Sequence, residues 1–287
     1  MAEITAALVK ELREITGAGM MECKKALSEA GGEIEAAIDV LRTRGLAAVA
    51  KKAGRATNEG TIMATIDASG KSGAVVEVKC ETDFVGINEK FHAYAKKIAD
   101  AAILAGDSVS IDNIKEAKLD GESVEDILTD CIHVMGENCE ISRVETVTSG
   151  GVAAYIHGGG KIGVLCTFDV DGIDPASDGF QTCARDVCMQ VAATNPVAAT
   201  REDVPADVVE HEMGIYKAQA AESGKPENIQ EKIAEGRMQK FYSESCLAEQ
   251  AFVKDGDISV TEYVNKCAKD LGGSIKINSF VRMALGE

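Results

Sequence analysis

Two similar strand–turn–strand patterns, one in each half of the chain, constrain its fold more than any other feature. The first is GTIMATIDASGKSGAVVEVKC at residues 60–80, and the second is GGVAAYIHGGGKIGVLCTFDV at residues 150–170. In both, apolar residues alternate with other residues on either side of a glycine-containing turn, which predicts a β-hairpin. In the first hairpin we expect six side chains to share one face of the sheet: Ile62, Ala64, Ile66, Val76, Val78 and Cys80.

Each predicted hairpin is followed by a helical segment and, further on, by a single strand. The first helix has one apolar stripe, formed by Phe91, Tyr94, Ile98 and Ala102. The second helix covers residues 177–194, and an acidic helical stretch is expected from Ile111 to Met135. The closing strands are ENCEISRVETV and GGSIKINSFVRMAL, which resemble each other.

The order of these elements predicts an α+β fold with a two-part core. Each part is one copy of a hairpin–helix–strand unit. We place the first part at residues 55–148 and the second at residues 149–201 together with 242–287, which include a C-terminal tail. With 287 residues, the chain is long enough for this arrangement and for further modules.

Residues 1–54 are predicted to form a three-helix module before this core. Glycines divide the segment at Gly17 and Gly19 and again at Gly31–Gly32, and the third helix is expected to stop near Gly45. A basic helix and a linker follow. Three short helices with apolar stripes are enough for a minimal compact bundle.

Residues 202–241 are predicted to form a helical hairpin inserted into the second core unit. Two helical runs flank ESGKPE, in which Gly224 suits the end of one helix and Pro226 the first position of the next. The apolar stripe of this hairpin is one-sided. It therefore needs a partner, which is the other arm, another subunit or a different protein.

The charge of the chain argues against a nucleic-acid-binding protein. Its net charge is −17 and its pI is near 4.7, whereas nucleic-acid-binding domains are normally basic. One stretch contains five cations and no acid: Arg42, Arg44, Lys51, Lys52 and Arg55. This stretch is either a solvated helix face or a docking surface for an acidic partner. The chain lacks a long apolar run, so we expect no contact with a membrane.

The nine cysteines are scattered singly and indicate reduced, mostly buried thiols. Only Cys183 and Cys188 lie close together, at a spacing without precedent in metal sites. We therefore expect neither a disulfide framework nor a zinc site. Reduced thiols, and a first helix with no signal peptide before it, favour a cytoplasmic protein.

Two glycine-rich stretches imitate nucleotide-binding motifs but fail on context. SGKS at residues 69–72 lacks the first glycine of a P-loop, because position 65 is Thr65, and GGGKIG at residues 158–163 fits GxGxxG. Both lie between two strands, so they are predicted to be hairpin turns. None of the four histidines lies in an HExxH or nucleophile-elbow context. We expect no catalytic centre, cofactor or metal site, although a Cys–His pair that meets only in space stays open.

The stretch CETDFVGINEKF places a carboxylate and a large aromatic in a predicted connecting loop. If the alternation of the preceding strand continues, Thr82 and Phe84 point inward and Phe84 plugs the end of a core. Asp83 would then be the N-cap of the following helix. Alternatively, the loop protrudes and presents an aromatic anchor and a carboxylate to a partner. The pattern alone does not choose between these interpretations.

Four segments resemble the bacterial elongation factor Ts family. They are EITAALVKELREITGAGMMECKKAL near the start, CETDFV, HGGGKIGVL and SGKPENIQEKIAEGRMQKF. The segments follow the family's order, and the resemblance covers essentially the whole chain. The sequence departs from the family at Gly86, where alanine is expected, and at Ala251, where proline is usual. A glycine at position 86 would make the loop more flexible.

The resemblance implies guanine-nucleotide exchange on elongation factor Tu, the GTPase that delivers aminoacyl-tRNA to the ribosome. It implies that the loop Thr82, Asp83, Phe84 and Val85 displaces magnesium from that GTPase, and that Met20 and His157 make secondary partner contacts. It also implies that residues 1–54 are ubiquitin-associated-like and that residues 202–241 form a coiled coil. Such a protein is not an enzyme, because it makes no covalent bond.

Two other functions and several assembly states stay open at this point. A pure interaction scaffold would bind its partners without exchanging nucleotide, and a thiol enzyme would have one hyper-reactive cysteine. The chain could act as a monomer, a homodimer, a heterodimer with elongation factor Tu or a dimer of such heterodimers.

Overall fold

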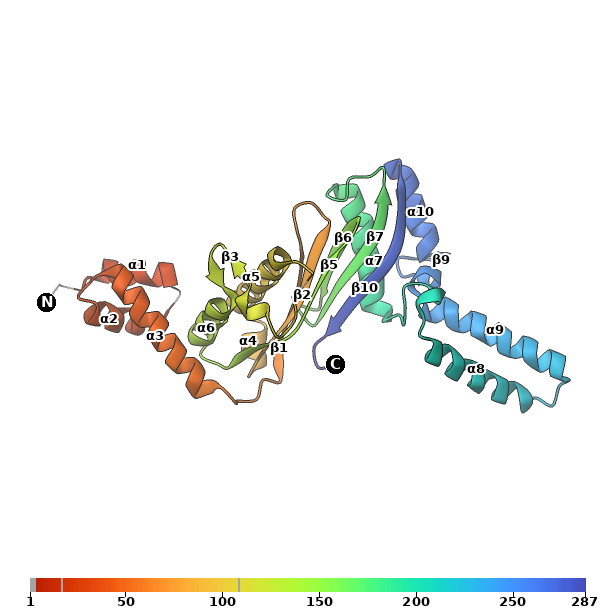
Figure 1. Cartoon of the computed structure of the whole chain (residues 1–287), viewed down its shortest axis with the longest axis horizontal. Coiled ribbons are helices and arrows are strands. Elements are labelled where there is room, and N and C mark those ends of the chain that lie inside the picture. Colours follow the sequence, from red (N-terminus) through yellow and green to blue (C-terminus); the bar gives the residue numbers. More distant parts are fainter. Residues whose placement is uncertain (1–3, 17, 108) are drawn as a thin grey trace.

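The computed structural model describes residues 4–16, 18–107 and 109–287, and it has the mixed α+β architecture that the sequence predicts. The molecule is elongated (Figure 1). A group of three helices lies at one end, two β-sheets occupy the middle, and a helical hairpin projects at the other end. Among the described residues, no helix is both long and apolar enough to cross a membrane.

The N-terminal helices form a bundle with its own core. Helices α1 (Ala6–Thr16), α2 (Met20–Glu29) and α3 (Ile34–Lys52) bury a shared set of apolar side chains: Val9, Leu12, Ala18, Cys23, Ala26, Leu27, Ala37 and Leu41. The predicted break before α2 is confirmed at Gly19, which is the N-cap of that helix. Gly17 lies outside the described residues.

The prediction that the third helix stops near Gly45 is wrong. Helix α3 continues to Lys52, because Gly45 faces helix α6 (Val124–Met135) rather than ending the helix. A Cβ atom at Gly45 would lie 3.3 Å from Cγ2 of Thr129. The absence of a side chain at this position therefore lets two helices approach closely, and this contact joins the N-terminal bundle to the core.

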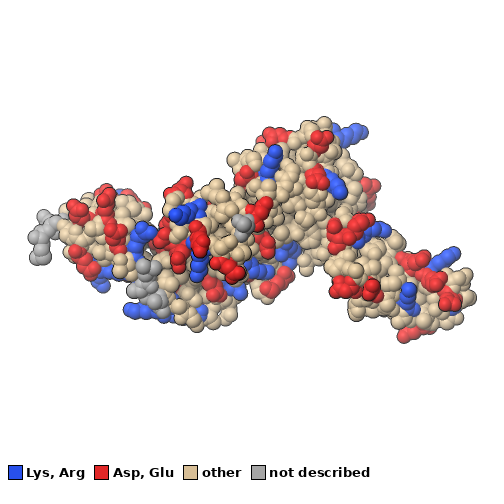
Figure 2. All heavy atoms as spheres, in the orientation of Figure 1, with Lys and Arg blue, Asp and Glu red and all other residues tan. Residues whose placement is uncertain are grey.

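The basic stretch from Arg42 to Arg55 pairs with acids and carbonyls of the chain itself. Arg42 forms an ion pair with Asp126 at 2.9 Å, and Arg44 forms one with Glu29 at 2.6 Å. Lys52 Nζ donates to the carbonyl oxygen of Ile132 at 2.8 Å. Acidic and basic side chains are interspersed over the face shown in Figure 2. These contacts favour a structural role for the basic stretch over a docking surface for an acidic partner.

The first sheet has the order β1 (Glu59–Ile66), β2 (Ser72–Cys80) and β5 (Cys139–Thr148), with antiparallel neighbours. Helix α5 (Glu89–Ala105) packs on it with the predicted stripe, in which Phe91 and Ile98 are fully buried. The predicted acidic helix from Ile111 is wrong in its first half. Two elements precede α6 there: a 3-10 turn (Ile114–Glu116) and a small hairpin of β3 (Lys118–Leu119) and β4 (Glu122–Ser123).

The six side chains predicted on one face of the first hairpin lie on two faces. The register pairs Ile62 with Glu77 and Ala64 with Val75, and residues that are directly opposite share a face. Val76 therefore points to the helices, while Ile62 points to the second sheet. Alternation within one strand does not fix its register against the next strand, which explains the error.

The second sheet repeats the topology of the first. Its order is β6 (Gly151–His157), β7 (Ile162–Asp171) and β10 (Ser274–Ala284), covered by α7 (Asp178–Thr194) and α10 (Val260–Leu271). In both sheets the third strand carries one extra residue, Ser142 in β5 and Asn278 in β10. A bulge at the same place in both copies supports the predicted repeat of a hairpin–helix–strand unit.

The two sheets pack against each other through an apolar cluster. Ile62 and Val75 come from the first sheet, and Val152, Leu165 and Met283 come from the second. At the edge of this contact, a turn of the second sheet lies against β1, where the amide of Ile62 donates to the carbonyl oxygen of Gly160 at 2.7 Å.

The inserted segment forms two helices, α8 (Ala206–Ala221) and α9 (Glu227–Ser245), that pack on each other. Gly224 in the turn has a φ of 66°, as its predicted place at a helix end requires, and Pro226 is the N-cap one position before α9. Ile215 and Ile229 stay exposed. The short strands β8 (Ala251–Phe252) and β9 (Asp255–Ser259) return the chain to the second sheet.

The close contact between Gly160 and β1 generates a stability prediction. Gly159 and Gly160 both have positive φ, but only at Gly160 would a Cβ atom overlap another group, the Thr61 hydroxyl. We expect Gly159→Ala to cost about 1 kcal/mol through its backbone conformation alone. Gly160→Ala should cost at least about 1 kcal/mol more through overpacking. Urea unfolding measures both variants, and equal losses would show that the turn does not press on β1.

Candidate partner-binding site

The predicted loop after β2 is a one-turn helix, α4 (Asp83–Gly86), that joins β2 to α5. Thr82 is its N-cap, with Oγ1 accepting from the amide of Val85 at 3.5 Å. The prediction that Asp83 caps the following helix is wrong. Asn88 takes that role, since its Oδ1 accepts from the amide of Lys90 at 2.9 Å.

The structure rejects the interpretation that Phe84 plugs a core. The Phe84 side chain is 79% exposed, whereas Val85 is only 9% exposed and lies in the core beneath the first sheet. The alternation of β2 ends at Cys80, and helical backbone then turns successive side chains by about 100°. Val85 therefore takes the inward position that a continued strand would have given to Phe84.

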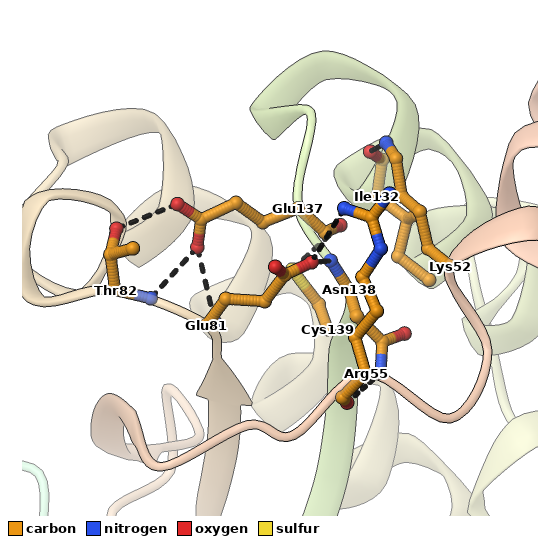
Figure 3. Close-up of polar contacts among 8 residues, drawn as sticks. All are labelled: Lys52, Arg55, Glu81, Thr82, Ile132, Glu137, Asn138 and Cys139. Atoms are coloured by element: carbon orange, nitrogen blue, oxygen red, sulfur yellow. Dashed lines mark hydrogen bonds and ion pairs between the residues drawn. The ribbon is translucent and has the colours of Figure 1, made fainter.

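One carboxylate holds the chain just before α4 (Figure 3). Glu137 Oε2 accepts from the amides of Glu81 and Thr82, each at 3.0 Å, and Glu137 Oε1 accepts from the Thr82 hydroxyl at 2.6 Å. Glu137 lies in the turn between α6 and β5, 55 positions from Thr82 along the chain. No pattern in the sequence points to this contact.

The Glu81 carboxylate makes the reciprocal contact with the turn that carries Glu137. Glu81 Oε1 accepts from the amide of Asn138 at 2.6 Å and pairs with Arg55 at 3.3 Å. The hydrogen bond from Asn138 lowers the pKa of the Glu81 carboxyl below its ordinary value, and the Arg55 guanidinium lowers it further, against a smaller rise from desolvation. Asn138 Nδ2 also donates to the carbonyl oxygen of Arg55 at 3.0 Å. The linker after α3 and the approach to α4 are therefore fastened to one turn.

Met20 lies beside α4 across a groove between the N-terminal bundle and the core. The groove has a volume of about 740 Å³ and is lined on one side by Gly19 and Met20 and on the other by Val85 and Asn88. Met20 is exposed, as are its neighbour Met21 and, after α4, Ile87. Sequence reasoning missed Met21 and Ile87, because one exposed apolar residue cannot be told from a buried one by type alone.

His157 ends β6. Its Nδ1 lies 3.1 Å from the hydroxyl of Tyr155, and the turn that follows it lies against β1. A Cβ atom at Gly86 would lie 3.0 Å from the carbonyl oxygen of Gly60. The first residues of β1 therefore contact both α4 and the His157 turn. Gly86 is a close backbone contact rather than a loose hinge.

The thiols give little support to a thiol enzyme. All nine cysteines lie in the described part of the chain, and all but Cys267 are buried. Burial raises the pKa of Cys80 to about 12 and that of Cys246 to about 11. Buried thiols with raised pKa values are poor nucleophiles. The glycine-rich stretches lie in hairpin turns, as predicted, and among the described residues no three His, Cys, Asp or Glu side chains gather as a metal site requires.

The fold is modular, and its exposed apolar residues Met20, Phe84 and Ile87 lie on or beside an anchored helix. A family model described as "Elongation factor TS" matches residues 81–287. Elongation factor Ts of Clostridium botulinum (strain Eklund 17B / Type B) is 47% identical over 287 residues, covering 99% of this chain and 93% of that protein. Elongation factor Ts of Trichlorobacter lovleyi is 46% identical over 290 residues, with the same coverage of both chains. The chain belongs to the elongation factor Ts family, whose name places it in translation elongation.

The lowered pKa of Glu81 generates a pH prediction. Because the folded-state pKa lies below the unfolded value of about 4.3, the contribution of this carboxylate to stability is present above that pH. It is lost as the pH falls through the folded-state pKa. We expect Glu81→Gln to melt below the wild type at pH 7 and the difference to vanish in acid. Thermal unfolding across pH measures this, with the exposed Glu145→Gln as control. A difference that persists in acid would contradict the charge-based account.

Proposed function

We propose that this protein is a guanine-nucleotide exchange factor for elongation factor Tu. It binds the GDP complex of that GTPase, displaces Mg²⁺ and promotes GDP release, so that GTP can rebind. Membership of the elongation factor Ts family supports the partner. The observation that carries the mechanism is the 79% exposure of Phe84 on a helix that is anchored on both sides.

The proposed mechanism needs no covalent chemistry in this chain. A GTPase holds GDP through backbone amides and through a Mg²⁺ ion that bridges phosphate oxygens to the protein. A side chain wedged between its elements shifts them and breaks the coordination of the ion, and the phosphate charge is then poorly compensated. By linkage, a factor that weakens GDP binding is itself bound more weakly by the same ratio in the presence of GDP. It therefore speeds exchange in both directions, and the cellular excess of GTP sets the outcome.

Each residue of α4 has a distinct role in the proposal. Phe84 is the wedge, and the exposed Asp83 carboxylate contacts a partner helix or positions the segment. Thr82 caps the helix and Val85 anchors it in the core. Met20 and His157 make secondary contacts with the partner.

The proposal assigns the other modules to docking. Residues 1–54 act as a ubiquitin-associated-like module on the GTPase domain, and residues 202–241 act as a coiled-coil protrusion. Core parts 55–148 and 149–201 with 242–287 contact different domains of the partner. A translation factor of this kind works in the cytoplasm, with no nucleic acid or membrane bound directly.

Stopped-flow release of a fluorescent GDP from elongation factor Tu tests the proposal. The measurement is made with and without this protein at saturating Mg²⁺, with the Tu of a matched source. Acceleration by orders of magnitude supports exchange. A folded protein that binds this Tu without accelerating GDP release would be a scaffold, and the exchange function would be wrong.

The wedge role predicts the effect of removing the Phe84 ring. Phe84→Ala should leave the fold intact, because the ring is exposed, and should slow catalysed exchange at least about tenfold, as loss of a central aromatic anchor does. Leu104→Ala is the matched control, since Leu104 is 69% exposed at the far end of α5. Wild-type exchange by a folded Phe84→Ala protein would remove the wedge role.

A further inference from the structure

Helix α4 is too short to hold its own position. It has four residues, and isolated helices of fewer than about 12 residues are marginal in water because nucleation is costly. Its own hydrogen bonds run from the amide of Gly86 to the carbonyl of Thr82 and from the amide of Ile87 to that of Asp83. The direction in which Phe84 points therefore depends on what holds the two ends of the helix.

The C-terminal end of α4 is fixed by packing. Val85 is buried in the core beneath the first sheet, and Gly86 lies against Gly60 of β1. His92, one turn into α5, donates from Nε2 to the carbonyl oxygen of Gly86 at 2.8 Å. These contacts all lie at Val85 and Gly86, so they fix the C-terminal end of the helix. The N-terminal end needs a support of its own.

The N-terminal end of α4 is fixed mainly by Glu137, beside one weaker hydrogen bond from Cys80 Sγ to the carbonyl oxygen of Thr82 at 3.2 Å. The Glu137 carboxylate takes three hydrogen bonds, and all three donors belong to Glu81 and Thr82, directly before the helix. Hydrogen bonds to an ionised acceptor are roughly twice as strong as neutral ones. Thr82 therefore has two tasks, because its hydroxyl donates to Glu137 while it accepts from Val85.

The turn that carries Glu137 is held from the opposite direction. Its neighbour Asn138 donates its amide to Glu81 and its side-chain amide to the carbonyl of Arg55. Figure 3 shows these contacts around one centre, with Lys52 from the end of α3 beside them. The backbone at Glu137 is therefore held in place by the contacts of Asn138, unlike that of a carboxylate on a free surface loop.

We propose that Glu137 is the positioning residue of the exchange surface. It fixes the N-terminal end of α4, so that Phe84 meets the partner in one orientation without a prior search. The inference rests on the proposed function of Phe84 as the wedge. Glu137 acts through α4 and does not itself contact the partner's nucleotide or Mg²⁺.

The exchange kinetics of Glu137→Ala test this role. The maximal rate of GDP release should fall about tenfold, since small misplacements of a working group are costly. The concentration giving half the maximal rate should change less than about twofold, because the other contact surfaces are intact. Glu137→Gln keeps one oxygen acceptor for the two amides and should recover most of the rate. Glu145→Ala, an equal charge change at an exposed position of β5, should match the wild type.

A double variant separates positioning from general damage. If Glu137 acts through Phe84, then Glu137→Ala in a Phe84→Ala background should slow exchange no further than Phe84→Ala alone. If the double variant instead slows exchange by the product of the two single effects, Glu137 acts independently of Phe84, and the positioning role is overturned. Normal exchange by Glu137→Ala beside slow exchange by Phe84→Ala would also overturn it, with the proposed function intact.

Hydrogen exchange of the free protein tests the same inference without a partner. In Glu137→Ala, the amides of Gly86 and Ile87 should lose protection, while those in the middle of α5 keep it. Unchanged protection of α4 would overturn the inference. If the wild type fails to accelerate GDP release, the proposed function falls, and hydrogen exchange alone then decides whether Glu137 holds α4. If the alanine variant does not fold, Glu137→Gln replaces it in each arm, with partial losses in place of full ones.

Discussion

The face-to-face packing of the two three-stranded sheets is the interaction on which the rest of this structure depends. Gly73 of β2 lies against Leu165, to whose Cδ2 an added Cβ atom would be 3.1 Å, and an added Cβ atom at Gly163 of β7 would overlap Ile62. These two glycines therefore let β2 of the first sheet and β7 of the second approach the facing sheet closely. Each sheet has helices on its other face, so β2 and β7 are buried on both sides. An antiparallel sheet normally leaves one face to solvent, and here neither central strand does.

This packing also brings the candidate site together. The first residues of β1 contact both α4 and the turn after His157, with Gly60 against Gly86 and Ile62 bonded to Gly160. Segments that are far apart in sequence thereby belong to one body. The N-terminal bundle joins the same body through the contact of Gly45 with α6 and through the polar group around Asn138. The exposed apolar residues Met20, Phe84 and Ile87 thus hold a common geometry.

The sequence predicted those features that local pattern controls. The mixed α+β class, the antiparallel strand pairs and the α5 stripe follow from periodicity and turn residues, and the structure has them. Features set by contacts across the chain were not predictable. Three of them depend on a partner at least 15 positions away. They are the register of Ile62 against Glu77, the continuation of α3 past Gly45, and the hydrogen bond from Thr82 to Glu137. Whether Phe84 is buried or exposed was also not predictable, because a shift of one residue in the alternation separates the two.

A side chain that displaces parts of another protein must belong to a segment that is more rigid than the parts it displaces. The work that a factor does on its partner comes only from the difference between its affinities for the two states of that partner. If α4 could pivot, Phe84 would move aside when it met the partner state that binds nucleotide tightly. The steric conflict with that state would then be smaller, and so would the difference between the two affinities. Burial of Val85 and the three hydrogen bonds to Glu137 remove this freedom before binding, so its entropic cost does not fall on the complex. In this view, the polar group behind α4 matters as much as the ring in front of it, although no atom of that group needs to touch the partner.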